Sequence, residues 1–185
     1  MNAADYTDVM QKIAKGDEAA FRQLANALGQ RMFHLAYRLM GYQRNLAEDA
    51  VQEALLKLWR FAPNWQPTGS VQAYVSRLVY TSCMDLHRKA RPSEELPEDL
   101  AQPDTILETI LDKEQRNLLL GAIDKLPKRQ KDAVLLHYMG EHSQRQVAQI
   151  LGTTEKGIER LLARSRKRLR GLLFPAIDEK QGTKS

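Results

Sequence analysis

Hydrophobic residues recur every three to four positions over most of the chain, a spacing that predicts amphipathic helices. Residues 17–40 show it most clearly. Their apolar stripe consists of Phe21, Leu24, Leu28, Met32, Leu35 and Leu39. No segment alternates apolar and polar residues convincingly, as a half-buried strand would. The pattern therefore predicts an all-α protein.

Four helices are predicted in the first half of the chain. They cover about residues 5–14, 17–40, 45–61 and 70–89. Gly41 ends the second helix, Asn45 and Glu48 form a capping pair for the third, and Ser70 caps the fourth. The loop 62–69 between the last two contains two prolines and a glycine, which interrupt helices.

The same periodicity predicts the buried side chains of the third and fourth helices. In the third helix the inward residues are Leu46, Ala50, Val51, Ala54, Leu58 and Trp59. In the fourth helix they include Tyr74, Leu78 and Cys83. Cys83 is the single cysteine, so no intrachain disulfide is possible, and we expect a small core residue suited to a reducing compartment.

The composition changes sharply after residue 91. Residues 92–112 contain seven acidic side chains and three prolines but no Lys or Arg, which predicts a flexible linker. Two small helical domains therefore flank an acidic linker. We place the N-terminal domain, the linker, the C-terminal domain and the tail at residues 1–91, 92–108, 109–175 and 176–185.

The C-terminal domain ends in a predicted helix-turn-helix. Two helices at about 105–126 and 127–140 precede it. Ser143, with Gln146 as its capping-box partner, begins the first helix of the pair. Gly152 suits the left-handed residue after that helix, and Thr154 caps the second. In such a pair the second helix is the one that enters the major groove of DNA.

Positive charge is concentrated on this last helix. Residues 154–170 carry seven basic and two acidic side chains, and this excess of five equals the net charge of +5 of the whole chain. One interpretation is a solvated charged helix end. The capped helix pair favours the other interpretation, which is contact with DNA.

Other functional classes find little support in the sequence. No apolar run reaches the ~18 residues of a membrane span, and no signal peptide is recognisable, so we expect a cytoplasmic protein without membrane insertion. The four histidines lack the spacing of a zinc pair, and no nucleophile motif or phosphate-binding glycine loop occurs. We expect no catalytic residues, no metal and no cofactor.

Three segments resemble the extracytoplasmic-function group of bacterial sigma-70 factors. In chain order they are LAEDAVQEALLKLW (46–59), GSVQAYVSRLVYTSCMDLHRKAR (69–91) and LPKRQKDAVLLHYMGEHSQRQVAQILGTTEKGIERLLARSRKRLR (126–170). They look like the family's helix for the polymerase β′ clamp, its helix for the promoter −10 element and its −35-reading domain. The resemblance covers about residues 17–172 and implies three partners, namely core RNA polymerase (β′ clamp and β), promoter DNA and an anti-sigma factor.

The resemblance also implies three groups of site residues. Those for polymerase binding are Asp49, Gln52, Glu53 and Leu56. Those for the −10 element are Asn64, Trp65, Gln66, Arg77, His87, Arg88 and Lys89. Those for the −35 element are Gln144, Arg145, Lys156, Glu159, Arg160, Arg164 and Arg166. The recognition helix has Gly157, Ile158 and Glu159 where the family often has Thr-Val and a basic residue, so the promoter sequence is not implied.

Two alternatives stay open at this stage. The first is a sigma-like decoy that binds an anti-sigma factor and reads no DNA, although a decoy has no need of a basic recognition helix. The second is an autonomous helix-turn-helix regulator, which would need a dimer surface to read paired half-sites.

Overall fold

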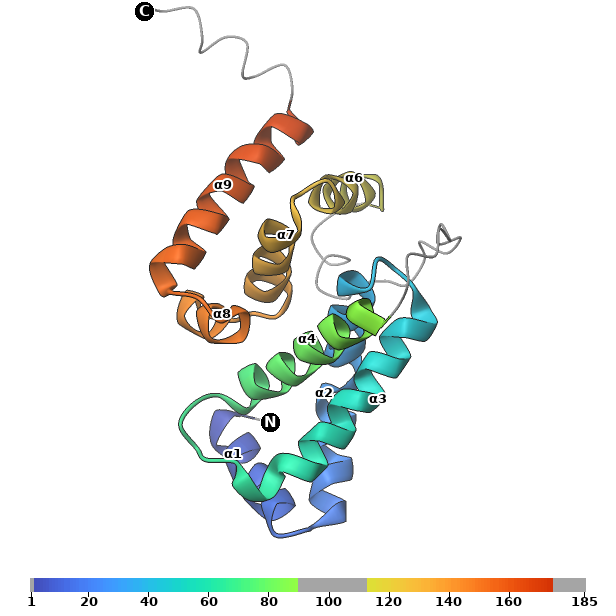
Figure 1. Cartoon of the computed structure of the whole chain (residues 1–185), viewed down its shortest axis with the longest axis vertical. Helices are drawn as coiled ribbons and strands as arrows, with labels where there is room; N and C mark the ends of the chain where they lie inside the picture. Colours follow the sequence, from blue (N-terminus) through green and yellow to red (C-terminus); the bar gives the residue numbers. More distant parts are fainter. Residues whose placement is uncertain (1, 90–112, 175–185) are drawn as a thin grey trace, which may run out of the picture. The chain divides into compact units, whose positions relative to one another are not determined.

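The computed structural model describes residues 2–89 and 113–174, and within these ranges the regular elements are all helical (Figure 1). The chain divides into two compact units, Met1–Leu100 and Ala101–Ser185, called here the N-terminal unit and the C-terminal unit. The predicted all-α class with two helical domains is confirmed. The predicted linker, both of its boundaries and the tail lie outside the described residues.

Four α-helices and one 3₁₀ turn form the described part of the N-terminal unit. They are α1 (Ala3–Ala14), α2 (Glu18–Leu39), α3 (Arg44–Phe61), η1 (Ala62–Asn64) and α4 (Val71–Lys89). Helix α3 packs against both α2 and α4, while α1 packs against α2 (Figure 1). The buried face of α3 consists of Ala47, Ala50, Ala54 and Leu58, and small side chains of this kind allow neighbouring helices to approach closely.

The starts of these helices show where local sequence rules hold and where they fail. Asp17 caps α2 by accepting a hydrogen bond from the amide of Ala20 at 3.0 Å. The predicted capping pair of α3 is wrong, because the helix already begins at Arg44 and lacks a side-chain cap. Glu48 instead accepts a hydrogen bond from Arg44 Nε at 2.8 Å, an ion pair four residues apart along the helix.

Five predicted core residues are also corrected, and two of them, Leu46 and Val51 of α3, are half-buried. Trp59 is 38% exposed, because it follows the buried Leu58 and is turned from it by about 100° around the helix. Its ring packs edge-on against Phe21, with centroids 5.3 Å apart. Tyr74 and Leu78 are half-buried, since α4 places smaller side chains in the core. The buried residues of α4 are Val71, Ala73, Val75, Val79, Ser82 and Cys83.

The C-terminal unit is built around one long helix. Its described elements are α6 (Lys113–Asp124), α7 (Lys128–Val134), the π-helical turn η2 (Leu135–Met139), α8 (Gln144–Leu151) and α9 (Glu155–Leu173). Helices α6, α7 and α8 all contact α9. The helix predicted at 127–140 is thus α7 continued by η2, and Pro127 is its N-cap. The start of the helix predicted at 105–126 lies outside the described residues.

The predicted helix-turn-helix is confirmed in its local details. Ser143 Oγ accepts from the amide of Gln146 at 3.3 Å, and Gln146 Oε1 accepts from the amide of Ser143 at 2.8 Å, which completes the capping box. Gly152 is left-handed, with φ of 62°, and ends α8. Thr154 Oγ1 accepts from the amide of Gly157 at 3.1 Å and caps α9. These contacts fix where α9 begins.

None of the helices in the described ranges combines the length and the apolar character that crossing a membrane requires.

Candidate functional site

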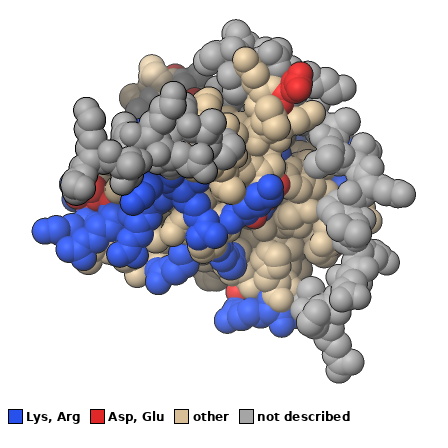
Figure 2. Space-filling view, turned by 90° about the horizontal axis from the view of Figure 1, so that it is seen from above, with Lys and Arg blue, Asp and Glu red and all other residues tan. Residues whose placement is uncertain are grey.

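The outer side of α9 carries a continuous basic surface. Ile158, Leu162 and Ser165 are buried and define the inner side of the helix. Helical geometry at 100° per residue places Lys156, Arg160 and Lys167 on the opposite side. All seven basic side chains of the helix are exposed: Lys156, Arg160, Arg164, Arg166, Lys167, Arg168 and Arg170. Figure 2 shows Lys and Arg side chains gathered together with few carboxylates among them.

The residues predicted for the −35 element differ in how freely their side chains extend from the C-terminal unit. Lys156, Arg160 and Arg164 point outward along one side of α9, and Glu159 is exposed beside them. Arg166 is turned by about 120° from Arg160, and its Nη1 donates to the hydroxyl of Tyr138 at 3.4 Å. The two residues predicted at the start of α8 are a half-buried Gln144 and an exposed Arg145.

Two of the three basic residues at the start of α7, Lys128 and Lys131, form ion pairs within the C-terminal unit. Lys128 Nζ lies 3.2 Å from the buried carboxylate of Asp132. Lys131 Nζ lies 2.6 Å from Asp124 Oδ1. In each pair the carboxylate neutralises the charge of the lysine. Most basic side chains without an ion pair in the described part of the unit therefore belong to α9.

A second candidate surface lies on α3. Asp49, Gln52, Glu53 and Leu56, predicted for polymerase binding, are all exposed on one side of this helix, and Leu56 is 60% exposed. Sequence reasoning missed that this surface continues to Trp59, which it had placed in the core. The surface therefore has a polar, acidic part at Asp49, Gln52 and Glu53 and an apolar part at Leu56 and Trp59 further along the helix.

The residues predicted for the −10 element fall on η1, the loop after it and α4. Asn64 and Gln66 are exposed, whereas Trp65 is half-buried. Asn64 ends η1, and Trp65 and Gln66 follow it, so all three come within five residues of the end of α3.

On α4, Arg77, His87, Arg88 and Lys89 are all exposed. Arg77 and Arg88 lie eleven residues apart, which places both on the same side of the helix. His87 differs from these arginines because its ring already contacts another helix. Its Nε2 lies 3.1 Å from the carbonyl oxygen of Leu39 at the end of α2. That contact provides one partner for the last turn of α2, whose carbonyls lack partners within the helix.

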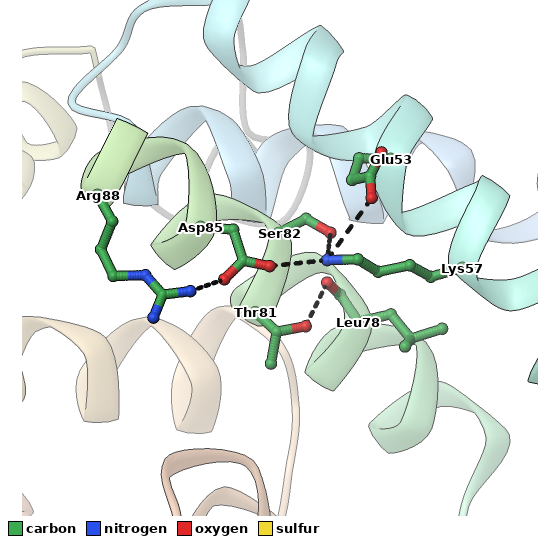
Figure 3. Close-up of polar contacts among 7 residues, drawn as sticks. All are labelled: Glu53, Lys57, Leu78, Thr81, Ser82, Asp85 and Arg88. Atoms are coloured by element: carbon green, nitrogen blue, oxygen red, sulfur yellow. Dashed lines mark hydrogen bonds and ion pairs between the residues drawn. The ribbon is translucent and has the colours of Figure 1, made fainter. Parts of the chain in front are cut away.

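A chain of alternating charges links α3 to the end of α4 (Figure 3). Lys57 Nζ lies 2.9 Å from Asp85 Oδ2, 3.2 Å from Ser82 Oγ and 3.8 Å from Glu53 Oε1. The other carboxylate oxygen of Asp85 accepts from Arg88. The pKa of Asp85 lies below its ordinary value, because the hydrogen bond from Lys57 and the charges of Lys57 and Arg88 outweigh its partial burial.

Sequence reasoning missed Lys57 and Asp85. The pair spans 28 residues and two helices, so helical periodicity could not reveal it. The available local signal was an Asp and an Arg three residues apart on α4.

Within residues 2–89 and 113–174, no three His, Cys, Asp or Glu side chains gather as ligands for a metal ion.

Each of the two units matches a known protein family. Residues 24–93 match the family described as Sigma-70 region 2, and residues 116–169 match Sigma-70, region 4. The chain is 30% identical over 158 residues to the ECF RNA polymerase sigma factor SigM of Mycobacterium tuberculosis, covering 85% of this chain and 79% of that protein.

Two solved structures share the fold. One is CnrH in complex with the cytosolic domain of CnrY, with a TM-score of 0.68, 24% identity and coverage of 94% of this chain and 99% of that chain. The other is the sigma factor RpoE of Bartonella quintana with the anti-sigma factor NepR, with a TM-score of 0.64, 21% identity and coverage of 83% and 96%.

Proposed function

Because this chain belongs to the extracytoplasmic-function group of sigma-70 factors, we propose that it binds core RNA polymerase and directs it to promoters with −10 and −35 elements. Its place of action is then the cytoplasm, where transcription begins, and the chemistry of RNA synthesis belongs to the polymerase rather than to this chain.

The observation that carries this proposal is the basic outer side of α9 on a capped helix-turn-helix. A helix held by its caps and its buried face presents its outer side chains in fixed register. Arg160 and Lys156, near the start of α9, are suited to base edges, because Arg and Lys can bridge two acceptors of guanine. Arg164 and the later cations are suited to phosphates, which contribute affinity without sequence information.

The α4 residues and the loop after η1 support a role at the −10 element. Opening a duplex requires unstacked bases to be held, and aromatic and guanidinium planes stack on bases at about 1–3 kcal/mol per base. Arg77 and Arg88 share one side of α4, and Trp65 lies in the loop before it. We therefore propose that these side chains hold the melted strand, with Asn64 and Gln66 reading a displaced base.

The α3 surface supports docking on the polymerase. Asp49 and Glu53 can pair with basic side chains of the partner, while Leu56, about one turn after Glu53, supplies an apolar anchor beside them. A sigma factor of this fold has been solved with an anti-sigma factor. We propose that an anti-sigma factor also binds this chain and that it competes for the α3 surface.

A binding measurement with purified core polymerase tests the proposal. Asp49→Arg should weaken the association of the full chain with core polymerase at least tenfold, because a charge reversal places like charges opposite each other. Asp8→Arg is the matched control, since Asp8 is an exposed acidic residue that belongs to α1 and not to the α3 surface. Equal affinity of wild type and Asp49→Arg would contradict the assignment of this surface, and no association of the wild type would reject the function.

A further inference from the structure

Lys57 is held far more firmly than an ordinary surface lysine. Its side chain is only 19% exposed, and its ammonium group meets Asp85, Ser82 and Glu53 at the distances given above (Figure 3). The ammonium group donates hydrogen bonds to Asp85 Oδ2 and Ser82 Oγ, and the carboxylate of Glu53 adds an ion pair at the longer distance of 3.8 Å. Ser82 is fully buried, which places the inner end of this contact within the packing of α3 against α4.

Asp85 divides its carboxylate between two cations on different helices. One oxygen accepts from Lys57 of α3, and the other accepts from Arg88 of α4. Arg88 is 78% exposed, so packing alone does little to fix its guanidinium group. Because the part-buried Lys57 holds the Asp85 carboxylate in place, that carboxylate can keep the guanidinium group of Arg88 beside it.

We propose that Asp85 is a positioning residue that holds Arg88 ready for promoter DNA and, through Lys57, ties it to the polymerase-facing helix α3. This inference rests on the proposed function, because it takes Arg88 to contact DNA and α3 to contact polymerase. Glu53 belongs to the α3 surface and is the fourth member of the charge chain. The network therefore runs from the proposed polymerase surface to the proposed DNA surface within one unit.

The physical effect of Asp85 is to restrict Arg88 before DNA binds. Immobilising a long side chain on binding costs about 0.5–1.5 kcal/mol, which corresponds to about a two- to tenfold loss of affinity. Removing the Asp85 charge has a second effect, since one negative charge fewer beside the DNA strengthens nonspecific binding. Loss of Asp85 should therefore lower the preference for a promoter over other DNA, even where total DNA binding does not fall.

The test is a double-mutant cycle on the full chain assembled with core polymerase. Its template is a duplex that the wild-type complex selects from a library randomised in both promoter elements. Promoter preference is the transcript yield from this duplex divided by the yield from the same duplex with a scrambled −10 element. The variants are Asp85→Asn, Arg88→Ala and the two combined.

Arg88→Ala should lower promoter preference about two- to tenfold in the wild-type background and much less in the Asp85→Asn background. Glu48→Gln is the control background, because it breaks another ion pair of α3, with Arg44, that lies outside the charge chain. There Arg88→Ala should retain its full effect. An equal Arg88→Ala effect in the wild-type and Asp85→Asn backgrounds would overturn the positioning role.

Lys57→Met provides a second route to the same answer. It keeps an apolar chain of similar length and removes the cation that holds Asp85. If thermal unfolding shows that Asp85→Asn is not folded, Lys57→Met replaces it in the double-mutant cycle. Additive effects of Lys57→Met and Arg88→Ala on promoter preference would then overturn the inference. Wild-type chain that yields no promoter-directed transcripts rejects the proposed function instead, whereas an active wild type with additive variants rejects the positioning role alone.

Discussion

At the scale of single residues, the contacts of a charged side chain within its own unit decide how freely it can meet a partner. Arg160 and Lys156 extend outward from α9, whereas Arg166 already contacts Tyr138. On α4, His87 contacts the end of α2 while Arg77 is exposed. We therefore expect Arg160 and Arg77 to contribute more to DNA binding than Arg166 and His87.

Glu159 should influence which base the recognition helix prefers. A carboxylate accepts hydrogen bonds only, which suits the amino group of cytosine, whereas an amide both donates and accepts, which suits adenine. Glu159→Gln should therefore shift the preferred base at one −35 position, as measured by selection from a randomised library. Glu114→Gln on α6 is a control that should leave the selected sequences unchanged. Identical selections by wild type and Glu159→Gln would show that Glu159 does not face a base.

Asp85 should make the stability of the N-terminal unit depend on pH in the acid range. Its pKa in the folded chain is lowered from an ordinary value of 3.8, so its charge stabilises the fold above that value. This contribution is lost as the pH falls through the lowered pKa. For a partly exposed pair we expect about 0.5–1 kcal/mol at pH 7.

The measurement is urea unfolding of wild type and Asp85→Asn, followed at several pH values. The difference in the free energy of unfolding should be largest near neutral pH and should shrink below about pH 4. A difference that stayed constant down to pH 3 would mean that the Asp85 charge does not stabilise the fold.

At the scale of elements, the sequence predicted those features that depend on near neighbours. The capping box of Ser143 and Gln146, the turn at Gly152 and the cap at Thr154 each involve residues within a few positions, and all were correct. The predicted start of α3 was wrong because Glu48 could either cap the helix together with Asn45 or pair with Arg44, and it pairs with Arg44.

Errors in the core and the missing network have a different cause. Whether Trp59 or Leu58 faces inward depends on how α3 is rotated against α2 and α4, which periodicity fixes only to within about one residue. The partner of Lys57 lies on another helix, so only the packed structure identifies Asp85. Trp59, Lys57 and Asp85 are thus the residues of the candidate sites on α3 and α4 that sequence reasoning missed.

Two glycines differ in the space around them, so replacing each by alanine tests the local packing. A Cβ atom at Gly140 would lie 2.6 Å from the carbonyl oxygen of Leu136 and 2.8 Å from the ring of His142, whereas at Gly29 of α2 it would meet nothing within 4 Å. Gly140→Ala should therefore destabilise the C-terminal unit by about 1–3 kcal/mol. Gly29→Ala should stabilise the N-terminal unit by about 0.5–1 kcal/mol, since alanine favours a helix interior.

Both effects can be measured on the same chain. The two tryptophans, Trp59 and Trp65, belong to the N-terminal unit, so their fluorescence follows that unit in urea unfolding, while circular dichroism follows both units. Gly29→Ala should move the fluorescence transition and Gly140→Ala should leave it in place. A stable Gly140→Ala variant would show that the turn before α8 can relax around a side chain.

At the scale of the whole molecule, the proposed function divides binding between two units on one chain. Each unit offers a modest surface, and linkage raises the effective concentration of the second surface once the first is bound. The N-terminal unit would dock on polymerase and contact the −10 element, and the C-terminal unit would contact the −35 element. Polymerase would then fix the spacing of the two DNA-reading surfaces, so we expect the free chain to bind promoter DNA poorly.

The most direct test of this account is transcription by core polymerase on a library of duplexes randomised at the −35 and −10 positions, with and without the purified chain. We predict that the chain produces transcripts from a selected family of templates, all sharing two sequence elements at a fixed spacing and starting at a fixed distance downstream. Transcripts that were no more frequent or more sequence-selective than those of core polymerase alone would contradict the account.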